Sequence, residues 1–267
     1  MQEIISIKNA KVKYWFQLYH KSALRKKQGE FVIEGIKEVE MALKNNYAID
    51  FVLYFPDLID ENLIKKWKDK YSSDFELIKI SKEIFEKMAY RKTTGGVLAI
   101  AKVKTHNINY LKLSKKPLII VAEGIEKPGN LGAILRTVDG IGADAFILVN
   151  SVVDLYNPNV IRSSLGTIFS NQIAISDFKT IKKFLLQNRI KLFAATLQNS
   201  HPYYLEDFTQ ASAIAVGSEA KGLTQEFREI EHQAIYIPME GQADSLNVSV
   251  SAAVLGYEAL RQRKILK

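Results

Sequence analysis

Polar residues that could handle a hydroxyl group and a charged ligand gather in three stretches, each directly after an apolar run typical of a strand. The stretches are Glu123–Arg136, Gly217–Leu223 and Ile237–Gly256. Loops at the carboxyl ends of strands in one open α/β sheet converge on a single crevice, so the pattern predicts one site. The ordinary alternative for Ser245 and Asn247 is that they only cap the helix that follows them.

Strands and helices alternate along the whole chain, which predicts an α/β fold. In the first part, strands expected at 50–55, 75–80 and 97–103 indicate a small domain with a parallel or mixed sheet. In the second part we expect a buried strand at 118–124, a helix capped by Asn130, and strands near 171–175, 191–197, 212–217 and 234–239. On a helical wheel, Arg136 leaves the apolar face of its helix, so its side chain is available to a ligand.

The positive charge is concentrated in the first part. Of the 37 Lys and Arg residues, 23 lie at or before Pro117, together with 14 of the 29 Asp and Glu residues. That part therefore has a net charge of +9. Residues 8–28, expected to form one helix capped by Asn9, carry seven basic residues and no acid. This favours binding to a polyanion such as RNA over a purely solubilising role. The candidate phosphate contacts are Lys21, Arg25, Lys26, Lys27, Arg91 and Lys92.

The composition also excludes several kinds of chemistry. The chain has no cysteine, so disulfides, thiolate zinc sites and a cysteine nucleophile are excluded, and we expect no metal at the site. No apolar run is long enough to span a membrane, and the first ten residues lack a signal-peptide core. These features predict a cytoplasmic protein with no membrane partner.

The three stretches in this order resemble a known family. N-L-G-A-I-L-R (Asn130–Arg136), G-S-E-A-K-G-L (Gly217–Leu223) and I-P-M with S-L-N-V-S (Ile237–Ser249) are similar to the three motifs of the SpoU, or TrmH-type, RNA ribose 2′-O-methyltransferases of the SPOUT superfamily. The resemblance implies a methyltransferase domain at 118–267, a linker at 105–117 and an RNA substrate-binding domain at 1–104.

The resemblance implies a Rossmann-like parallel sheet with a deep trefoil knot, a homodimer formed through the C-terminal domain, and S-adenosylmethionine as cofactor. It assigns Arg136 to the ribose 2′-hydroxyl. It gives Asn130, Glu219 and Asn247 positioning roles, and Ser245 a hydrogen bond near the reacting centre or to an RNA phosphate. The cofactor-binding residues that it implies are Thr196, Gly217, Ser218, Glu219, Ile237, Met239, Ser245 and Leu246. Leu165 departs from the family pattern, which has a smaller residue there.

Two other functions remain compatible with these residues. One is a non-enzymatic RNA-binding or ribosome-assembly module on the same fold, and the other is methylation of a base nitrogen. Within the ribose-methylating function, ribosomal RNA is the first expected substrate and transfer RNA the second.

Overall fold

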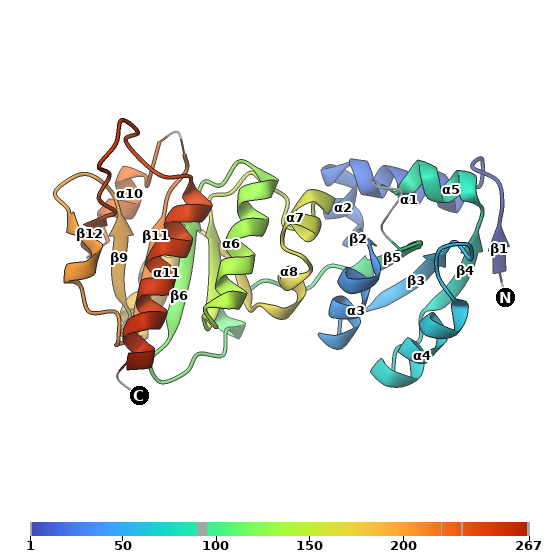
Figure 1. Cartoon of the computed structure of the whole chain (residues 1–267), viewed down its shortest axis with the longest axis horizontal. Coiled ribbons are helices and arrows are strands. Elements are labelled where there is room, and N and C mark those ends of the chain that lie inside the picture. The colour runs from blue at the N-terminus through green and yellow to red at the C-terminus, as the bar shows by residue number, and fades with distance from the viewer. Residues whose placement is uncertain (1, 90–94, 220, 231, 266–267) are drawn as a thin grey trace. The chain divides into compact units, whose positions relative to one another are not determined.

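Two compact units make up the chain in a computed structural model that describes residues 2–89, 95–219, 221–230 and 232–265 (Figure 1). Unit 1 contains Met1–Thr105 and Asp154–Ser170, and unit 2 contains His106–Val153 and Asn171–Lys267. Each unit has its own sheet. None of the helices in the described residues is long and apolar enough to cross a membrane.

Unit 1 is built on a mixed five-stranded sheet of order β1-β4-β3-β5-β2. Its strands are β1 (Gln2–Ile4), β2 (Glu30–Glu34), β3 (Ile49–Tyr54), β4 (Glu76–Ile80) and β5 (Val97–Lys102). β4 is parallel to β1 and β3, whereas β5 is antiparallel to both β2 and β3. This confirms the prediction of a small domain with a parallel or mixed sheet.

Helices cover both faces of this sheet (Figure 1). One face carries α1 (Ala10–His20), α2 (Ser22–Gln28) and α5 (Lys82–Met88), and the other carries α3 (Ile36–Lys44) and α4 (Glu61–Tyr71). Trp15 of α1 and Phe85 of α5 are buried in the core between the first face and the sheet. Burial of such large side chains supplies most of the free energy that holds the layers together.

The single helix expected at 8–28 is wrong, because the backbone becomes extended at Lys21, with φ −110° and ψ 106°. Asn9 caps α1 as predicted, accepting a hydrogen bond from the backbone N–H of Lys11. The break is stabilised by Arg25, whose guanidinium donates to the carbonyl oxygens of Leu18 and Tyr19 at 2.8 Å each. These bonds satisfy carbonyls that the end of a helix leaves without backbone partners.

A segment from within the expected methyltransferase domain packs in unit 1. Residues 154–170 contain α7 (Pro158–Ser163) and α8 (Thr167–Ser170), and Tyr156 and Phe169 stack against Phe31 of β2 at ring-centroid distances of 4.2 and 6.1 Å. The hydroxyl groups of Tyr47 and Tyr156 are 3.3 Å apart. A single domain boundary near residue 117 therefore does not describe the structure, because residues 154–170 pack in unit 1 through this aromatic cluster.

Unit 2 is a seven-stranded, entirely parallel sheet of order β10-β12-β9-β11-β6-β7-β8. This confirms an α/β fold with an open parallel sheet. The strands are β6 (Leu118–Glu123), β7 (Ala145–Val149), β8 (Ile173–Ser176), β9 (Lys191–Ala195), β10 (His201–Pro202), β11 (Ser212–Val216) and β12 (Gln233–Tyr236).

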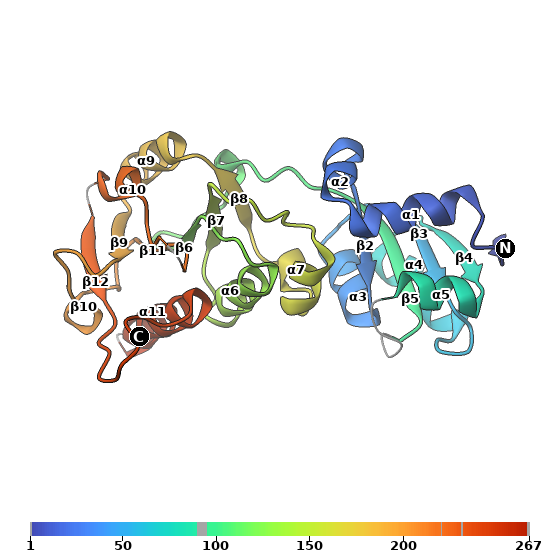
Figure 2. The ribbon, with the colours of Figure 1, turned by 90° about the horizontal axis from the view of Figure 1, so that it is seen from above.

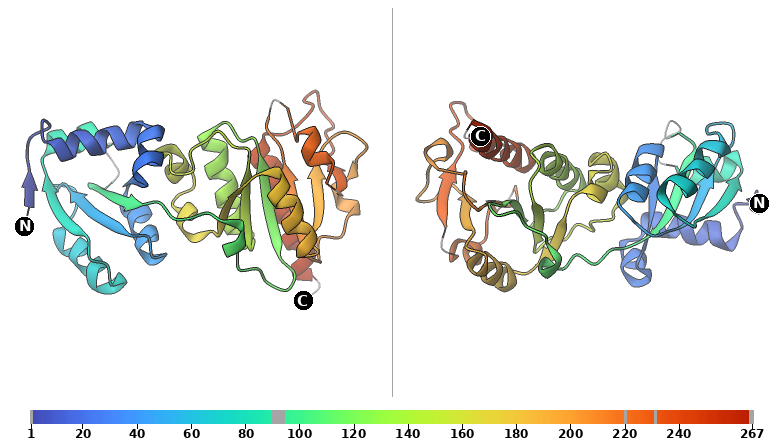
Figure 3. Two further views of the ribbon diagram at one scale, coloured as in Figure 1. Left: turned by 180° about the vertical axis from the view of Figure 1, so that it is seen from behind. Right: turned by 90° about the horizontal axis from the view of Figure 1, so that it is seen from below.

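Two pairs of helices cover the two faces of this sheet. α6 (Pro128–Gly140) and α11 (Val248–Ile265) lie on one face, and α9 (Phe178–Gln187) and α10 (Gln225–Arg228) lie on the other (Figure 2 and Figure 3). α6 and α11 touch at Gly256, where an added Cβ would lie 2.8 Å from Ile141. The segment 106–117 is packed on unit 2, since the backbone N–H groups of Lys112 and Ser114 donate to the side chains of Gln172 and Asp144 at 2.9 and 2.7 Å.

The start of α6 corrects one expectation from the sequence. The helix begins at Pro128 and its cap is Lys127, so Asn130 lies inside the first turn and does not cap the helix. Proline is favoured at this first position because its missing N–H has no partner there in any case. The core positions predicted on the wheel are buried: Leu131, Ile134, Leu135, Val138 and Ile141.

Candidate active site

Two adjoining cavities of about 320 and 110 Å³ lie at the carboxyl ends of β9, β11 and β12 in unit 2. They share residues from the loops that follow β9 and β12, including Thr196, Ser245 and Leu246. The loop after β11 adds Gly217, Ser218 and Glu219 to the larger cavity, and Ile237 lines the smaller one. Seven of the eight predicted cofactor residues therefore surround one space. Met239 follows two residues later but lies outside both linings.

The loop after β11 is held so tightly that position 217 requires glycine. A Cβ there would lie 2.0 Å from the carbonyl carbon of Gly222 and 2.2 Å from the backbone nitrogen of Leu223. The backbones of Ser218 and Gly222 bond to each other in both directions, at 3.2 and 2.9 Å. The close approach places the loop backbone at the cavity wall, where a bound ligand can reach it.

A buried carboxylate anchors the far end of this loop. Glu123, the last residue of β6, is 1% exposed and accepts hydrogen bonds from the backbone N–H and the hydroxyl of Thr224, at 2.8 and 2.7 Å. Thr224 in turn caps α10 by accepting from Phe227 N–H at 3.3 Å. The end of β6 and the start of α10 are thereby joined through one side chain, which fixes the position of residues 217–223 between them.

Glu219 contacts polar side chains from the other two predicted stretches, so all three stretches meet at its carboxylate. It accepts a hydrogen bond from the Asn130 amide at 3.0 Å and another from the Asn247 amide, and it forms an ion pair with Lys127. The Asn247 amide also lies 3.3 Å from Oδ1 of Asn130. Lys127 and Asn130 lower the pKa of Glu219, so its carboxylate is stabilised in the charged form. We call Lys127, Asn130, Glu219 and Asn247 the Glu219 cluster.

Asn247 has two functions in this arrangement. Its Oδ1 accepts from the backbone N–H and the hydroxyl of Ser249, at 2.9 and 2.6 Å, which confirms the predicted cap at the start of α11. Its amide simultaneously contacts the cluster. Ser245 lines both cavities and is exposed. The sequence analysis did not predict a role for Lys127. The one local signal is its position directly before Pro128, which marks the start of α6.

Arg136 is exposed on α6, as the wheel predicted, and does not join the Glu219 cluster. It follows Asn130 by six residues, which on an ideal helix corresponds to about 9 Å of rise and about 240° of rotation. The guanidinium is therefore presented on a different part of the helix surface from the Asn130 amide.

The predicted RNA contacts divide into three groups. Lys21, Lys26 and Lys27 are exposed on and beside α2, as a phosphate contact requires. Arg25 is a correction: it is 2% exposed, and its Nε donates to Asp154 at 2.7 Å, so its charge is used inside the protein. Arg91 and Lys92 lie outside the described residues. No cluster of three or more metal-binding side chains was found in the described part of the chain.

Two family models match the chain. The model described as the SpoU rRNA Methylase family matches residues 117–257, and one described as an MRM3-like substrate binding domain matches residues 9–99. The first covers all three stretches that line the cavity or contribute to the Glu219 cluster. The second covers most of the basic N-terminal part.

Named relatives are similar along their full lengths. The chain is 31% identical to the 23S rRNA (guanosine(2553)-2′-O)-methyltransferase RlmP of Bacillus subtilis, covering 96% of this chain and 98% of the relative. It is 25% identical to the 23S rRNA (uridine(2479)-2′-O)-methyltransferase of Streptomyces viridochromogenes, over 97% and 92%. A crystal structure described as an RNA 2′-O ribose methyltransferase is 36% identical, with a TM-score of 0.82 over 98% and 100% of the two chains.

The fold recurs at lower identity. The SpoU methyltransferase AviRb from Streptomyces viridochromogenes, solved in complex with the cofactor AdoMet, is 24% identical and has a TM-score of 0.87 over 96% of this chain and 99% of its own. At that identity the likeness concerns the fold alone.

Proposed function

The chain belongs to the SpoU rRNA methylase family, and we propose that it transfers a methyl group from S-adenosylmethionine to a ribose 2′-hydroxyl of ribosomal RNA. The observation that carries this proposal is the convergence of three strand-end loops on one cavity beside the Glu219 cluster. Two named relatives modify 23S rRNA at a guanosine and a uridine, which favours ribosomal over transfer RNA.

The cavity residues fit a nucleoside cofactor. The larger cavity combines backbone from 217–219 with apolar walls from Leu223, Leu246 and Val248, a lining suited to an adenine ring with polar edges. The close backbone approach at Gly217 leaves the loop free of a side chain where the cofactor would lie. When bound, S-adenosylmethionine supplies an electrophilic methyl group. It would be held by Thr196, Ser218, Ile237, Ser245 and Leu246. Met239, two residues after Ile237, would lie beside it.

In this proposal Arg136 contacts the weakly acidic 2′-hydroxyl of the ribose. A guanidinium stays protonated at neutral pH, so it acts by stabilising the oxygen as negative charge develops there. Asn130, Glu219 and Asn247 hold the loops around the reacting centre, and Ser245 contributes a hydrogen bond there or to an RNA phosphate. The remaining requirement is to exclude water from the reacting atoms.

The separation of Arg136 from the Glu219 cluster supports a homodimer built through the methyltransferase domain. In that assembly, Arg136 of one subunit acts beside the cofactor of its partner, which accounts for its position on another part of α6. Family membership also supports threading of the C-terminal segment as a deep trefoil knot. The expected location is the cytoplasm, where ribosomal RNA is assembled into ribosomes.

Unit 1 provides the RNA affinity in this proposal. Lys21, Lys26 and Lys27 are exposed within its basic N-terminal part, and lysines contacting phosphates hold RNA without reading its sequence. Arg25 is left out of this contact surface. Residues 1–104 thus act mainly as the substrate-binding part, and residues 118–267 as the catalytic part.

Mapping of ribose methylations in RNA from cells with and without this protein tests the proposal. One 2′-O-methyl group in 23S rRNA should disappear with the protein and return with the wild-type chain. Loss of a methyl group from transfer RNA would show that the substrate is transfer RNA. Loss of a methyl group from a base nitrogen would show that the enzyme methylates a base. An unchanged methylation pattern with impaired ribosome assembly would favour the non-enzymatic alternative.

A further inference from the structure

The segment 106–117 of unit 2 has no role in the methyl transfer described above, yet it presents a distinctive surface. It contains three lysines and no Asp or Glu. Its apolar side chains pack against the core of unit 2: Ile108, Leu111 and Leu113. One aromatic residue and the three lysines are exposed: Tyr110, Lys112, Lys115 and Lys116. An anchored backbone therefore holds an aromatic ring and positive charge toward solvent.

Tyr110 ends the short 3₁₀ helix η1 (Ile108–Tyr110), which is fixed on both sides. Asn107 caps η1 by accepting from the backbone N–H of Asn109 at 2.9 Å, and the N–H of Leu111 donates to the Ile108 carbonyl at 3.3 Å. Residues three apart eclipse each other on a 3₁₀ helix, which suits the burial of both Ile108 and Leu111. Tyr110 lies between them and is 69% exposed.

Tyr110 differs from most tyrosines of the chain in having no partner. The hydroxyls of Tyr14, Tyr54 and Tyr71 donate to glutamates at 2.5 to 2.7 Å. No hydrogen bond, ring contact or cation over the ring was found for Tyr110 among the described residues. Its ring is thus available to a ligand, and the anchored turn spares a ligand the entropy of ordering it.

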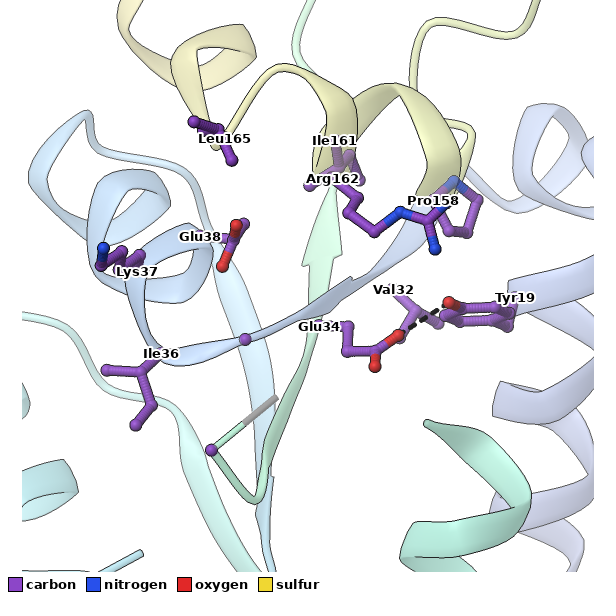
Figure 4. Close-up of a pocket in the computed structure, with 12 residues that line it drawn as sticks. Tyr19, Val32, Glu34, Ile36, Lys37, Glu38, Pro158, Ile161, Arg162 and Leu165 are labelled. Atoms are coloured by element: carbon purple, nitrogen blue, oxygen red, sulfur yellow. Dashed lines mark hydrogen bonds between the residues drawn. The ribbon is translucent and has the colours of Figure 1, made fainter. Parts of the chain in front are cut away.

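Polar groups that border a cavity elsewhere in the chain already have partners. The cavity of about 510 Å³ in unit 1 is drawn in Figure 4. There the hydroxyl of Tyr19 donates to Glu34 at 2.7 Å, and the guanidinium of Arg162 donates to Asn159 at 2.8 Å. The backbone N–H of Glu38 donates to its own carboxylate. These side chains are held by the protein itself, in contrast to Tyr110.

Lys112 follows Tyr110 by two residues and is held equally firmly. Its backbone N–H donates to Oε1 of Gln172 at 2.9 Å, and its carbonyl accepts from the Gln172 amide at 2.8 Å. Leu111 and Leu113 pack inward on either side, so the Lys112 side chain turns outward. Two residues of extended chain span about 7 Å, a separation that one nucleotide can bridge.

The carboxylate that contacts this segment does not neutralise its lysines. Asp144 accepts from the backbone N–H groups of Ser114 and Leu118, at 2.7 and 2.9 Å. In the part of the chain that the structure describes, neither Lys112 nor Lys115 forms an ion pair. Both charges are therefore available to a polyanion.

We propose that Tyr110, Lys112 and Lys115 form a contact surface for single-stranded RNA, with one base stacked on the Tyr110 ring and phosphates at the two lysines. Stacking on an aromatic ring is possible for every base, and lysines hold phosphates without reading sequence. The charge favours a polyanion, and an unpaired RNA strand also supplies flat faces for the ring. The surface adds to the lysines of unit 1 and rests on the proposed function in taking RNA as the substrate.

Oligonucleotide binding to the full chain tests this surface. The probes are a fluorescent single-stranded RNA of about 12 nucleotides, within the usual range of site sizes, and a duplex of the same sequence. Tyr110→Ala should weaken binding of the single strand about tenfold, the scale of one base–aromatic stack. Binding of the duplex should hardly change, because paired bases are already stacked on one another. Equal affinity of the wild type and Tyr110→Ala for the single strand overturns the proposal.

Further variants separate the ring from the charges. Tyr110→Phe keeps the ring and should bind as the wild type does. Neutralising Lys112 and Lys115 together should lower the slope of log K against log salt by about 1.4, or about 0.7 for each phosphate contact. Tyr204→Ala is the matched control, since Tyr204 is also exposed in unit 2, at 57%, and should leave affinity unchanged. An equal loss in the Tyr204 and Tyr110 variants contradicts the proposed surface.

Photo-crosslinking locates the contact without any substitution. A single strand carrying 4-thiouridine, irradiated with the wild-type chain, should crosslink to the peptide that contains Tyr110. Crosslinks confined to other peptides overturn the proposal, as they would if this surface binds a protein instead. Methyl transfer is not measured in any of these experiments, so their failure is distinguishable from a failure of the proposed enzymatic function, which methylation mapping reports.

Discussion

The side-chain amide of Asn130 donates a hydrogen bond to the carboxylate of Glu219 at 3.0 Å, although 89 positions separate them in the chain. Asn247, a further 28 positions on, bonds to the same oxygen of Glu219. One carboxylate thereby ties the helix after β6 to the loop after β11 and to the start of α11. These are the elements around the cavity, so Glu219 links them on the exposed side, while Glu123 and Thr224 hold the far end of the loop.

Glu219→Gln should reduce methyl transfer and weaken cofactor binding about tenfold, a change of roughly 1.4 kcal/mol. An amide in place of the carboxylate loses the ion pair with Lys127, and its NH2 group must face either Lys127 or both asparagines, because the two asparagines donate to the same oxygen. Global stability should change little, because the cluster is exposed and exposed pairs contribute roughly 0 to 1 kcal/mol. Calorimetry with S-adenosylhomocysteine measures the affinity. Glu240→Gln, at an exposed carboxylate in the loop after β12, is the matched control and should bind normally.

The Glu219 cluster should depend on pH only under acidic conditions. Lys127 and Asn130 lower the pKa of Glu219 in the folded protein. The contribution of this carboxylate is therefore fully present above the ordinary glutamate value of about 4.3 and is lost as the pH falls through the lowered pKa. Cofactor affinity measured from about pH 6 to about pH 8 should therefore show no change that titration of Glu219 would cause. A step that disappears in Glu219→Gln would contradict the assignment.

Gly217→Ala should abolish cofactor binding while unit 1 remains folded. The added Cβ would lie 2.0 Å from the backbone of Gly222, so residues 217–222 must move away from their present position. Gly241→Ala is the control, because a Cβ at position 241 meets no atom within 4 Å. Calorimetry with S-adenosylhomocysteine should find binding to the Gly241 variant only. Wild-type affinity in Gly217→Ala would mean that this loop does not line the cofactor site.

Arg136→Ala should abolish methyl transfer and leave cofactor binding nearly intact, because Arg136 lies outside both cavity linings. An RNA with a 2′-deoxy substitution at the target nucleotide should bind without accepting a methyl group. Radiolabelled cofactor and one short RNA give both results once the target is mapped. Transfer to the deoxy RNA would place the methyl group on the base.

Mixing two inactive variants tests whether Arg136 acts across a dimer. A heterodimer of Arg136→Ala and Gly217→Ala chains contains one site with an intact cavity from the first chain and Arg136 from the second. The mixture should therefore regain part of the wild-type activity. If Arg136 instead acts within its own chain, each site of the heterodimer lacks one component and the mixture stays inactive.

Neutralising Lys21, Lys26 and Lys27 together should weaken RNA binding and reduce its salt dependence. Each lysine that no longer neutralises a phosphate of a single strand lowers the slope of log K against log salt by about 0.7, so three lysines give about 2. Titration of RNA binding at several salt concentrations measures the slope. Lys179, Lys182 and Lys183, exposed on α9 of unit 2, provide a control triple with the same reduction in charge. The same slope in both triples would show that only net charge matters.

Much of the fold and part of the site could be predicted from the sequence because the relevant signals are local. The apolar runs of the strands, the wheel of α6 and the cap at Asn247 each depend on residues close together in the chain. The residues of the Glu219 cluster other than Lys127 could be named because three motifs occur in a known order. The pairing of Lys127 with Glu219 depends on how two loops meet, and no spacing in the sequence reports that.

Arg25 shows why a count of charges fails for individual residues. In the sequence it is one of seven basic residues in 8–28, and its neighbours Lys26 and Lys27 are indeed exposed. Its burial depends on Asp154, 129 positions away. The carboxylate belongs to a segment whose packing in unit 1 follows from aromatic contacts with Phe31. Charge and periodicity carry no information about such a distant partner.

Arg25→Ala should destabilise unit 1 by about 3 to 5 kcal/mol, the usual result of leaving one member of a buried ion pair without its partner. The guanidinium side chain is 3% exposed and the Asp154 side chain 10%, and the Leu18 and Tyr19 carbonyls also lose their donor. Both tryptophans of the chain, Trp15 and Trp67, lie in unit 1, so their fluorescence in a urea titration follows the unfolding of this unit alone. Lys26→Ala, one residue away and exposed, should change stability by no more than about 0.5 kcal/mol.

A double-mutant cycle separates the pair from the carbonyl bonds. Asp154→Ala leaves Arg25 buried with its two carbonyl bonds, and the double variant removes both charges. The double variant should be more stable than the sum of the two single effects predicts, since neither charge is then left buried alone. Simple additivity would mean that the two side chains act independently, Arg25 through the carbonyls of α1 and Asp154 through its hydrogen bond from the backbone N–H of Tyr156.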